Sequence, residues 1–225
     1  MENPWINLRM VNNEFIAECD KNHMYDFRYR LRGDYRLRLE GYPGPYTGDP
    51  FNSVLYILAL NPGHCEGEEI IYRQHEELFL NNLTHTNVQW PFITFFPELR
   101  NTPGGIWWTE KLKQIIFDTS LETVSKYIFN AEYFPYHSKK YKNINKILPS
   151  QRYTFFLVKN AIQNNKYILI MRSEETWYNV VPELRNYSKK VVLNNIRRPW
   201  ITSGNMDPII YQNIINTLRR ENNGT

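Results

Sequence analysis

Residues 54–63 read VLYILALNPG, an apolar run that ends abruptly in Asn-Pro-Gly. The run is continuous, without alternating polar residues, which is typical of a parallel strand that is buried on both faces. Asn-Pro-Gly directly after it predicts a tight turn, because proline presets its backbone angle and glycine adopts conformations that other residues avoid. The stretch therefore predicts a central strand that delivers Asn61 to one edge of a sheet.

Three further apolar segments have the same character, and they lie at 126–130, 166–171 and 190–193. Helical patterns separate or follow these segments, at 106–117, 151–164, 174–184 and about 207–220. Strands and helices in alternation indicate an α/β protein. We predict a three-layer sandwich, in which helices flank a central, mainly parallel four-stranded sheet.

We expect the chain to form one domain over residues 1–225, because no linker, repeat or low-complexity tract interrupts it. Residues 1–53 form a less regular N-terminal extension. Arginines alternate with tyrosines and leucines over 28–39, which predicts an amphipathic strand or hairpin. The segment 41–50 is rich in glycine and proline and predicts turns.

The composition is that of a folded protein: 42% of the 225 residues are apolar and 22% are charged. The net charge of +4 and the pI of about 8.9 are compatible with a polyanionic partner. Cys19 and Cys65 are too few for a disulfide framework or a four-ligand zinc site. The first thirty residues carry charges throughout and resemble no signal peptide, and no apolar stretch is long enough to span a membrane. We therefore expect a cytoplasmic monomer with no membrane partner.

Ligands of parallel sheets bind beyond the carboxyl ends of the strands. The residues that follow the predicted strands are polar, rich in amides and partly basic, and they lie at 61–64, 130–140, 172–173 and 194–199. These segments therefore hold the candidate site.

The string ALNPG at 59–63 resembles the first active-site motif of the uracil-DNA glycosylase superfamily, in the form of its mismatch-specific, thymine-DNA and single-strand-selective branches. Three later segments follow in the family's order. They are PFITFF at 91–96, where the family stacks a Phe on the flipped base, FNA at 129–131, where it keeps a base-reading Asn, and VLNN at 192–195 before RRP at 197–199, where its second motif enters the DNA minor groove. The usual His-Pro-Ser or Asn-Pro-Ser of that second motif is absent here.

The resemblance implies a monofunctional DNA glycosylase that needs no metal or cofactor. Asn61 would position the attacking water, and Asn194 or Asn195 would replace the donor of the second motif. The remaining implied residues bind either the base or the DNA backbone. They are Gly63, His64, Phe92 and Asn130 for the base, and Arg197, Arg198, Lys139 and Lys140 for DNA.

Gly63 stands where the uracil-specific branch has a Tyr that closes the pocket beside ring position five, so the resemblance implies a bulkier pyrimidine. A narrower hypothesis is similarity to bacterial anti-phage glycosylases that remove glucosylated hydroxymethylcytosine from phage DNA. Two alternatives stay open: repair of uracil or mismatched thymine, and an inactive member of the fold that binds DNA or a protein partner. Structural roles are open as well, since Asn61 can be a turn residue, Phe92 a core residue and Lys139 and Lys140 part of a solvated loop.

Overall fold

A mixed five-stranded sheet forms the centre of the computed structural model, which describes residues 1–86, 89–143 and 145–224. The strand order is β3-β5-β4-β6-β7. Four strands are parallel, namely β4 (Leu55–Ala59), β5 (Ile128–Glu132), β6 (Tyr167–Ile170) and β7 (Lys190–Val191). The fifth, β3 (Tyr46–Thr47), pairs antiparallel with β5. The α/β class and the mainly parallel sheet are thus confirmed.

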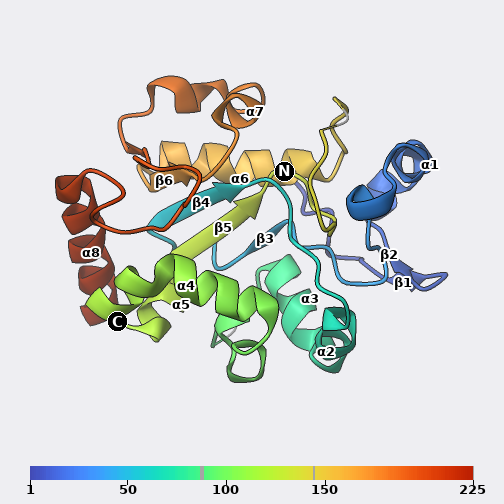
Figure 1. The fold of residues 1–225 in the computed structure, drawn as a ribbon, viewed down its shortest axis with the longest axis horizontal. Coiled ribbons are helices and arrows are strands. Elements are labelled where there is room, and N and C mark those ends of the chain that lie inside the picture. The colour runs from blue at the N-terminus through green and yellow to red at the C-terminus, as the bar shows by residue number, and fades with distance from the viewer. Residues whose placement is uncertain (87–88, 144, 225) are drawn as a thin grey trace.

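Helices cover both faces of the sheet (Figure 1). One layer holds α4 (Pro103–Asp118), α5 (Leu121–Tyr127) and α8 (Pro208–Asn223), and the other holds α6 (Gln151–Gln163) and α7 (Glu174–Tyr178). Side chains of β4 alternate between two core clusters, with Leu55 and Ile57 in one and Tyr56 and Leu58 in the other. The continuous apolar run of β4 is therefore explained by burial on both faces.

The prediction of four strands was wrong by one, because β3 lies inside the segment predicted to be turns. Gly48 follows β3 with a φ of +107°, and a Cβ there would lie 2.4 Å from the carbonyl oxygen of Ile128. Only glycine allows the chain to pass this close to the start of β5. The strand is two residues long, which is too short for a detectable apolar pattern.

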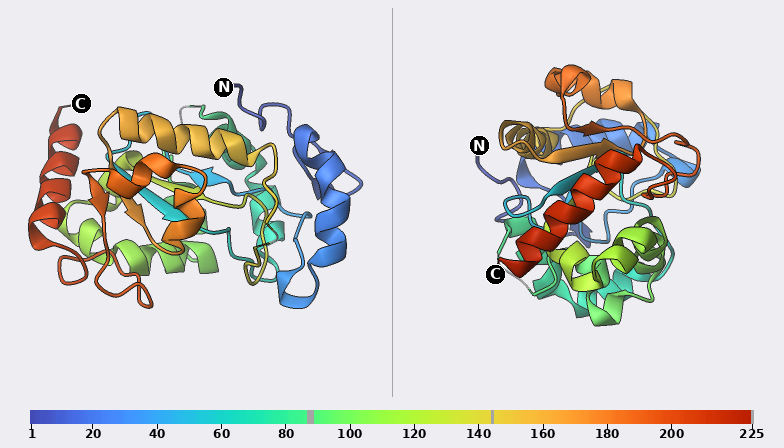
Figure 2. Two further views of the ribbon diagram at one scale, coloured as in Figure 1. Left: turned by 90° about the horizontal axis from the view of Figure 1, so that it is seen from above. Right: turned by 90° about the vertical axis from the view of Figure 1, so that its left-hand side faces the viewer.

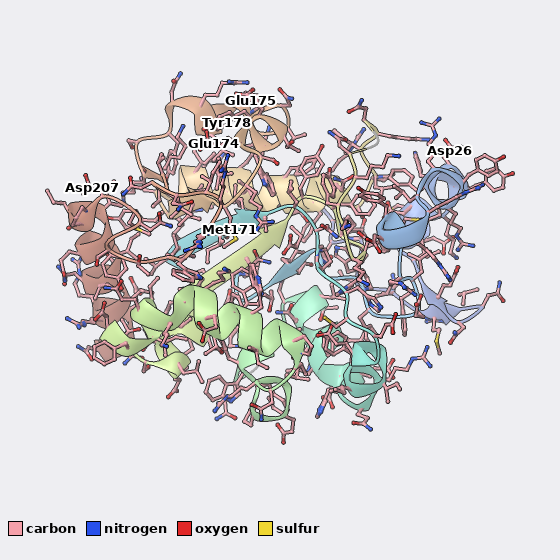
Figure 3. The ribbon with its side chains drawn as sticks, viewed as in Figure 1. Asp26, Met171, Glu174, Glu175, Tyr178 and Asp207 are labelled. Carbon is pink, nitrogen blue, oxygen red and sulfur yellow. The ribbon has the colours of Figure 1, made fainter. Side chains whose placement is uncertain are left out.

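Several predicted elements have different limits in the structure, among them β5 and α7. Helix α5 extends to Tyr127, so β5 begins at Ile128 and not at 126. The helix predicted over 174–184 stops at Tyr178, and a 3-10 turn over Pro182–Asn186 follows it. Pro182 has no N–H to donate and cannot continue the helix. Glu175, an exposed residue of α7 that is labelled in Figure 3, accepts from Arg185 at 2.7 Å.

The strand or hairpin predicted over the arginine-rich segment is a helix in its first part, α1 (Lys21–Arg30). Its buried residues Met24 and Phe27 are three positions apart, which is a helical spacing that the alternating arginines obscured. The remaining elements are short. They are β1 (Met10–Val11), β2 (Glu14–Phe15), α2 (Glu68–Gln74), α3 (Glu76–Thr84) and 3-10 turns at Glu18–Asp20, Gly33–Tyr35, Ile93–Phe95 and Pro97–Leu99.

The N-terminal segment is fastened to the rest of the protein by a buried carboxyl group. Asp20 is fully buried and accepts hydrogen bonds from the Tyr136 hydroxyl at 2.8 Å, the Ser150 hydroxyl at 2.5 Å and the Ser150 N–H at 3.0 Å. Trp5 and Phe27 are fully buried in the same core cluster as Tyr56. Figure 2 shows α1 at one end of the molecule and α8 at the other. Residues 1–53 are therefore part of the folded core.

Among the described helices, none is both long and apolar enough to cross a membrane.

Replacing Asp20 by Ala should lower the free energy of unfolding by at least about 2 kcal/mol, because three buried donors lose their acceptor. Asp26→Ala is the matched control, since Asp26 lies exposed on α1 (Figure 3) and only meets Lys146 at 2.9 Å. Its unfolding free energy should stay close to that of the unmodified protein. Urea denaturation measures both variants, and equal losses would contradict the fastening role of Asp20.

Candidate functional site

A cavity of about 730 Å³ opens at the carboxyl ends of β4, β5 and β6. Its volume lies within the range of about 300–1,000 Å³ that is usual for small-molecule sites. Of the predicted site residues, six line it: Asn61, Gly63, His64, Asn130, Lys139 and Lys140. Met171 marks the cavity side of β6, near the middle of the view in Figure 3. The parallel register has thus gathered three loops that are distant in the sequence.

Asn61 is held in a single orientation by Ser138. Its Nδ2 donates to the Ser138 hydroxyl at 2.9 Å, the Ser138 carbonyl at 3.3 Å and the Pro62 carbonyl at 3.0 Å. The Ser138 hydroxyl donates its hydrogen to the carbonyl of Lys140, so it can only accept a hydrogen bond from Asn61. The amide oxygen must therefore point away from these partners, and it accepts no hydrogen bond from the described residues. Asn61 thus offers a fixed acceptor at the cavity.

Gly63 leaves one side of the cavity open. A Cβ at this position would meet no atom within 4 Å, and its φ lies outside the left-handed region. The glycine is therefore not required by backbone strain. Its carbonyl accepts a hydrogen bond from Nδ1 of His137, a half-buried ring whose pKa is lowered by burial. His64 lines the cavity beside Gly63.

Asn130 and Glu132 belong to the cavity lining and lie two residues apart on β5, hence on the same face of the sheet. Both are buried, with 3% and 7% of their surface exposed. The Asn130 Nδ2 donates to Glu132 Oε1 at 2.9 Å. Burial raises the pKa of Glu132 to about 7, although the hydrogen bond from Asn130 lowers it. Glu132 thus holds its proton to a higher pH than an ordinary carboxyl group does.

Three buried polar atoms of the lining residues have no hydrogen-bond partner in the described part of the protein: Thr94 Oγ1, Asn130 Oδ1 and Glu132 Oε2. A buried polar atom without a partner costs about 1–3 kcal/mol. These three residues of the cavity lining each therefore have a polar atom that a bound ligand or an ordered water would satisfy.

Glu68 fixes the chain that follows Asn-Pro-Gly. Its carboxylate, buried beside the cavity, accepts from the Cys65 N–H and the Gly104 N–H, both at 3.2 Å. The first bond holds the loop and the second holds the start of α4. This acidic group therefore has protein partners for both of its oxygens.

Phe92 is fully buried, and its ring packs against Phe95 at 4.9 Å and Trp108 at 5.1 Å. The structure thus places Phe92 in the core behind the cavity, where it does not face a ligand. Other aromatic side chains line the cavity, among them Tyr42, Tyr72 and Trp107. A planar ligand that entered the cavity would therefore meet these rings and not Phe92.

Asn194 and Asn195 are exposed, and the structure does not bring them into the cavity lining. Asn195 Oδ1 accepts from the backbone N–H groups of Arg197 and Arg198, at 3.1 and 3.2 Å. Asn205 organises the same loop by accepting from the Asn195 N–H at 2.7 Å. The loop is therefore a built turn that presents Arg197 and Arg198 to solvent.

A basic and aromatic rim connects this loop to the cavity. Lys111 Nζ lies 5.4 Å from the ring centre of Trp107 and 5.8 Å from that of Trp200. Trp107 lines the cavity, Trp200 belongs to the loop, and both are exposed, by 39% and 47%. Burial and the charge of Arg172 lower the pKa of Lys111. We call these four residues the rim.

The two lysines predicted to bind DNA differ in their surroundings. Lys140 is paired with Asp34 at 2.8 Å, which raises the pKa of the lysine and lowers that of the aspartate. Lys139 forms no ion pair among the described residues. Of the two, only Lys139 has an ammonium group without a carboxylate partner among the described residues.

Sequence reasoning missed Glu132, Ser138 and Thr94. Glu132 was detectable, because it lies two residues beyond Asn130 on a predicted strand end and hence on the same face. Ser138 hydrogen-bonds to Asn61 although the two are 77 residues apart in the sequence, and no local sequence pattern predicts that contact. The same holds for Thr94, which reaches the cavity only through the packing of its loop.

Among the described residues, no group of His, Cys, Asp or Glu side chains is arranged to hold a metal ion. Comparisons of the chain with protein-family models, with curated proteins and with solved structures found no match.

Glu132 should make stability depend on pH between about 4.5 and 7. The folded protein holds a proton on Glu132 that the unfolded chain has lost, so this contribution is present below pH 4.5 and lost as pH rises through 7. Glu132→Gln cannot titrate. The unfolding free energy of the native protein minus that of the variant should therefore fall from pH 4.5 to pH 8, as followed by urea denaturation.

His85 is partly buried, which lowers its pKa to about 4. It acts in the opposite direction but is common to both proteins and cancels in this difference. A difference that stays constant across the range would show that Glu132 has an ordinary pKa.

Proposed function

We propose that this chain is a monofunctional DNA glycosylase that flips a modified pyrimidine out of DNA and hydrolyses its N-glycosidic bond. The observation that carries the proposal is the clamped amide of Asn61, whose free oxygen lies at a cavity that also contains Asn130. A water bound to that oxygen has its position fixed before the reaction, which is the main requirement of a hydrolytic site with no nucleophilic side chain.

The reaction forms a bond between the water oxygen and C1′ of the sugar and breaks the bond from C1′ to the base. The electron pair of the broken bond leaves with the base, and the proton of the water is released to the base or to solvent. The Asn61 oxygen accepts a hydrogen bond from the water as positive charge develops on the sugar. An amide is a far weaker base than a carboxylate, so we expect slow turnover.

The departing base needs a hydrogen-bond donor, which comes either from the loop of Asn194 and Asn195 or from His64. Asn194 and Asn195 lie outside the cavity lining, so either one acts only if its loop moves toward bound DNA. His64 lies in the lining itself, next to Gly63.

The proposed substrate carries a substituent at ring position five. The space beside Gly63 is open, and a cavity of about 730 Å³ is larger than a bare pyrimidine needs. Hydroxymethylcytosine and its glucosylated form, which occur in modified phage DNA, fit this description. Excision of these bases would give the protein a role in anti-phage defence. Uracil and mismatched thymine are smaller and are the alternative substrates.

DNA would approach across the rim. Arg172 and Trp107 belong to the cavity lining, and Lys111 lies between Trp107 and Trp200, which belongs to the loop that carries Arg197 and Arg198. Cations bind phosphate and exposed aromatic rings stack on unpaired bases, which together suit a nucleic acid with one extruded base.

Asn61→Ala should lower abasic-site formation by about a hundredfold or more and leave DNA affinity nearly unchanged, because the water loses its fixed acceptor in the transition state. The assay uses oligonucleotides that each contain uracil, a thymine mismatch, hydroxymethylcytosine or glucosylated hydroxymethylcytosine. Asn213→Ala, an exposed change on α8, is the control. If the native protein binds these oligonucleotides but excises no base, it is a binding member of the fold and the enzymatic proposal fails.

Replacing Arg197 and Arg198 together by Ala should weaken binding to every DNA sequence. Two lost phosphate contacts should reduce the slope of log affinity against log salt by about two, because fewer counterions are released. Arg219 and Arg220, on the C-terminal half of α8, provide a double variant with the same change in charge. Fluorescence anisotropy at several salt concentrations compares the pairs, and equal slopes in the two variants would remove the loop from the DNA interface.

A further inference from the structure

We propose that Glu132 is a second base-reading residue: its carboxylic acid O–H donates a hydrogen bond to the extruded base, and Asn130 Oδ1 accepts one from it. This inference rests on the proposed function and narrows it. The ligand class is a pyrimidine whose edge carries a hydrogen-bond donor next to an acceptor.

The pairing of the two side chains decides which of their atoms are available. Asn130 Nδ2 donates to Glu132 Oε1 at 2.9 Å, which leaves Asn130 Oδ1 and Glu132 Oε2. Both remaining atoms are buried and lack a partner among the described residues. Both residues are more than nine-tenths buried and both line the cavity. The two side chains are therefore hydrogen-bonded to each other through one polar atom each, and the second polar atom of each has no partner among the described residues.

The surroundings of Glu132 favour the neutral acid. None of the ion pairs found among the described residues includes Glu132, and its hydrogen-bond partner is an uncharged amide. An unpaired carboxylate at such depth is strongly disfavoured. The raised pKa of about 7 agrees with this reading. A neutral Glu132 then presents one donor beside the one acceptor of Asn130.

An edge of matching polarity occurs on two pyrimidines. The uracil type places the N3–H donor beside the O4 acceptor, and the cytosine type places the N4–H donor beside the N3 acceptor. Pyrimidin-2-one has no group at ring position four and lacks the pair altogether. A site whose buried polar groups are left unsatisfied rejects such an analogue strongly. The pair thus predicts selection at ring position four, independent of the open space beside Gly63.

The experiment compares Glu132→Gln with Glu132→Leu. Glutamine keeps an oxygen for Asn130 and supplies an N–H in place of the acid O–H, whereas leucine keeps similar bulk and loses both. The probes are oligonucleotides with one 5-hydroxymethyluracil, one 5-hydroxymethylcytosine or one pyrimidin-2-one, together with the corresponding free bases. Excision is followed as abasic sites, and binding of the free bases by NMR titration. Cooperative urea unfolding verifies that both variants fold.

We expect the native protein and Glu132→Gln to prefer a hydroxymethylated base over pyrimidin-2-one at least tenfold, and Glu132→Leu to lose that preference. Whichever of the two hydroxymethylated bases is preferred identifies the edge that is read. A loss in Glu132→Gln as large as in Glu132→Leu would overturn the inference, because a carboxylate would then be the active form. An unchanged preference in Glu132→Leu would overturn it as well.

The two proposals fail separately. If Glu132→Leu does not affect excision, the glycosylase proposal is supported and Glu132 has no role in base recognition. If the native protein binds the free bases selectively but excises none, the role of Glu132 is supported and the glycosylase proposal is rejected.

Discussion

The parallel pairing of β4 with β5 and with β6 is the constraint on which the cavity depends. Ala59 lies opposite Glu132, and Leu58 lies opposite Ile170, so the chain leaves all three strands at the same edge. A shift of one residue in the pairing of β5 would turn Asn130 and Glu132 to the opposite face. The register is fixed by two apolar layers, since the four β4 side chains from Leu55 to Leu58 alternate between them. Packing on both faces of the sheet thus determines which polar groups meet.

The parts that the sequence predicted are those with a local cause. The apolar runs of β4 and β6 are visible because burial on both faces leaves no polar position. Asn61 was located at the sheet edge because it follows its strand directly, but the tight turn predicted at 61–63 does not form, and the chain turns only at 66–67. Phe92 was assigned to a base because the segment 91–96 resembles one that stacks on a base in the glycosylase family, whereas its contact with Trp108 comes from a distant helix. Ser138 and β3 escaped for the same reason, since one acts across 77 positions and the other depends on the approach of Gly48 to Ile128.

Charge is distributed unevenly between the depth of the cavity and its mouth. The acidic groups lie inside, where Glu68 accepts from two backbone N–H groups and Glu132 accepts from the Asn130 amide at one of its two oxygens. The basic groups Lys139 and Arg172 lie in exposed positions of the lining. Such an arrangement suits a ligand that is neutral at its inner end and anionic outside. A nucleotide within a polynucleotide has this polarity, because its base is uncharged and its phosphates are not.

Asp20 connects the fold to the order in which the chain is made. Its partners Tyr136 and Ser150 follow it by 116 and 130 residues. At a synthesis rate of roughly 5–20 residues per second, the carboxyl group waits roughly 6–26 s for its last partner. Until then Trp5 and Phe27 have no complete core to enter. The segment around Asp20 is thus synthesised well before the residues that bury its carboxyl group, and its apolar side chains wait through the same interval for the rest of their core.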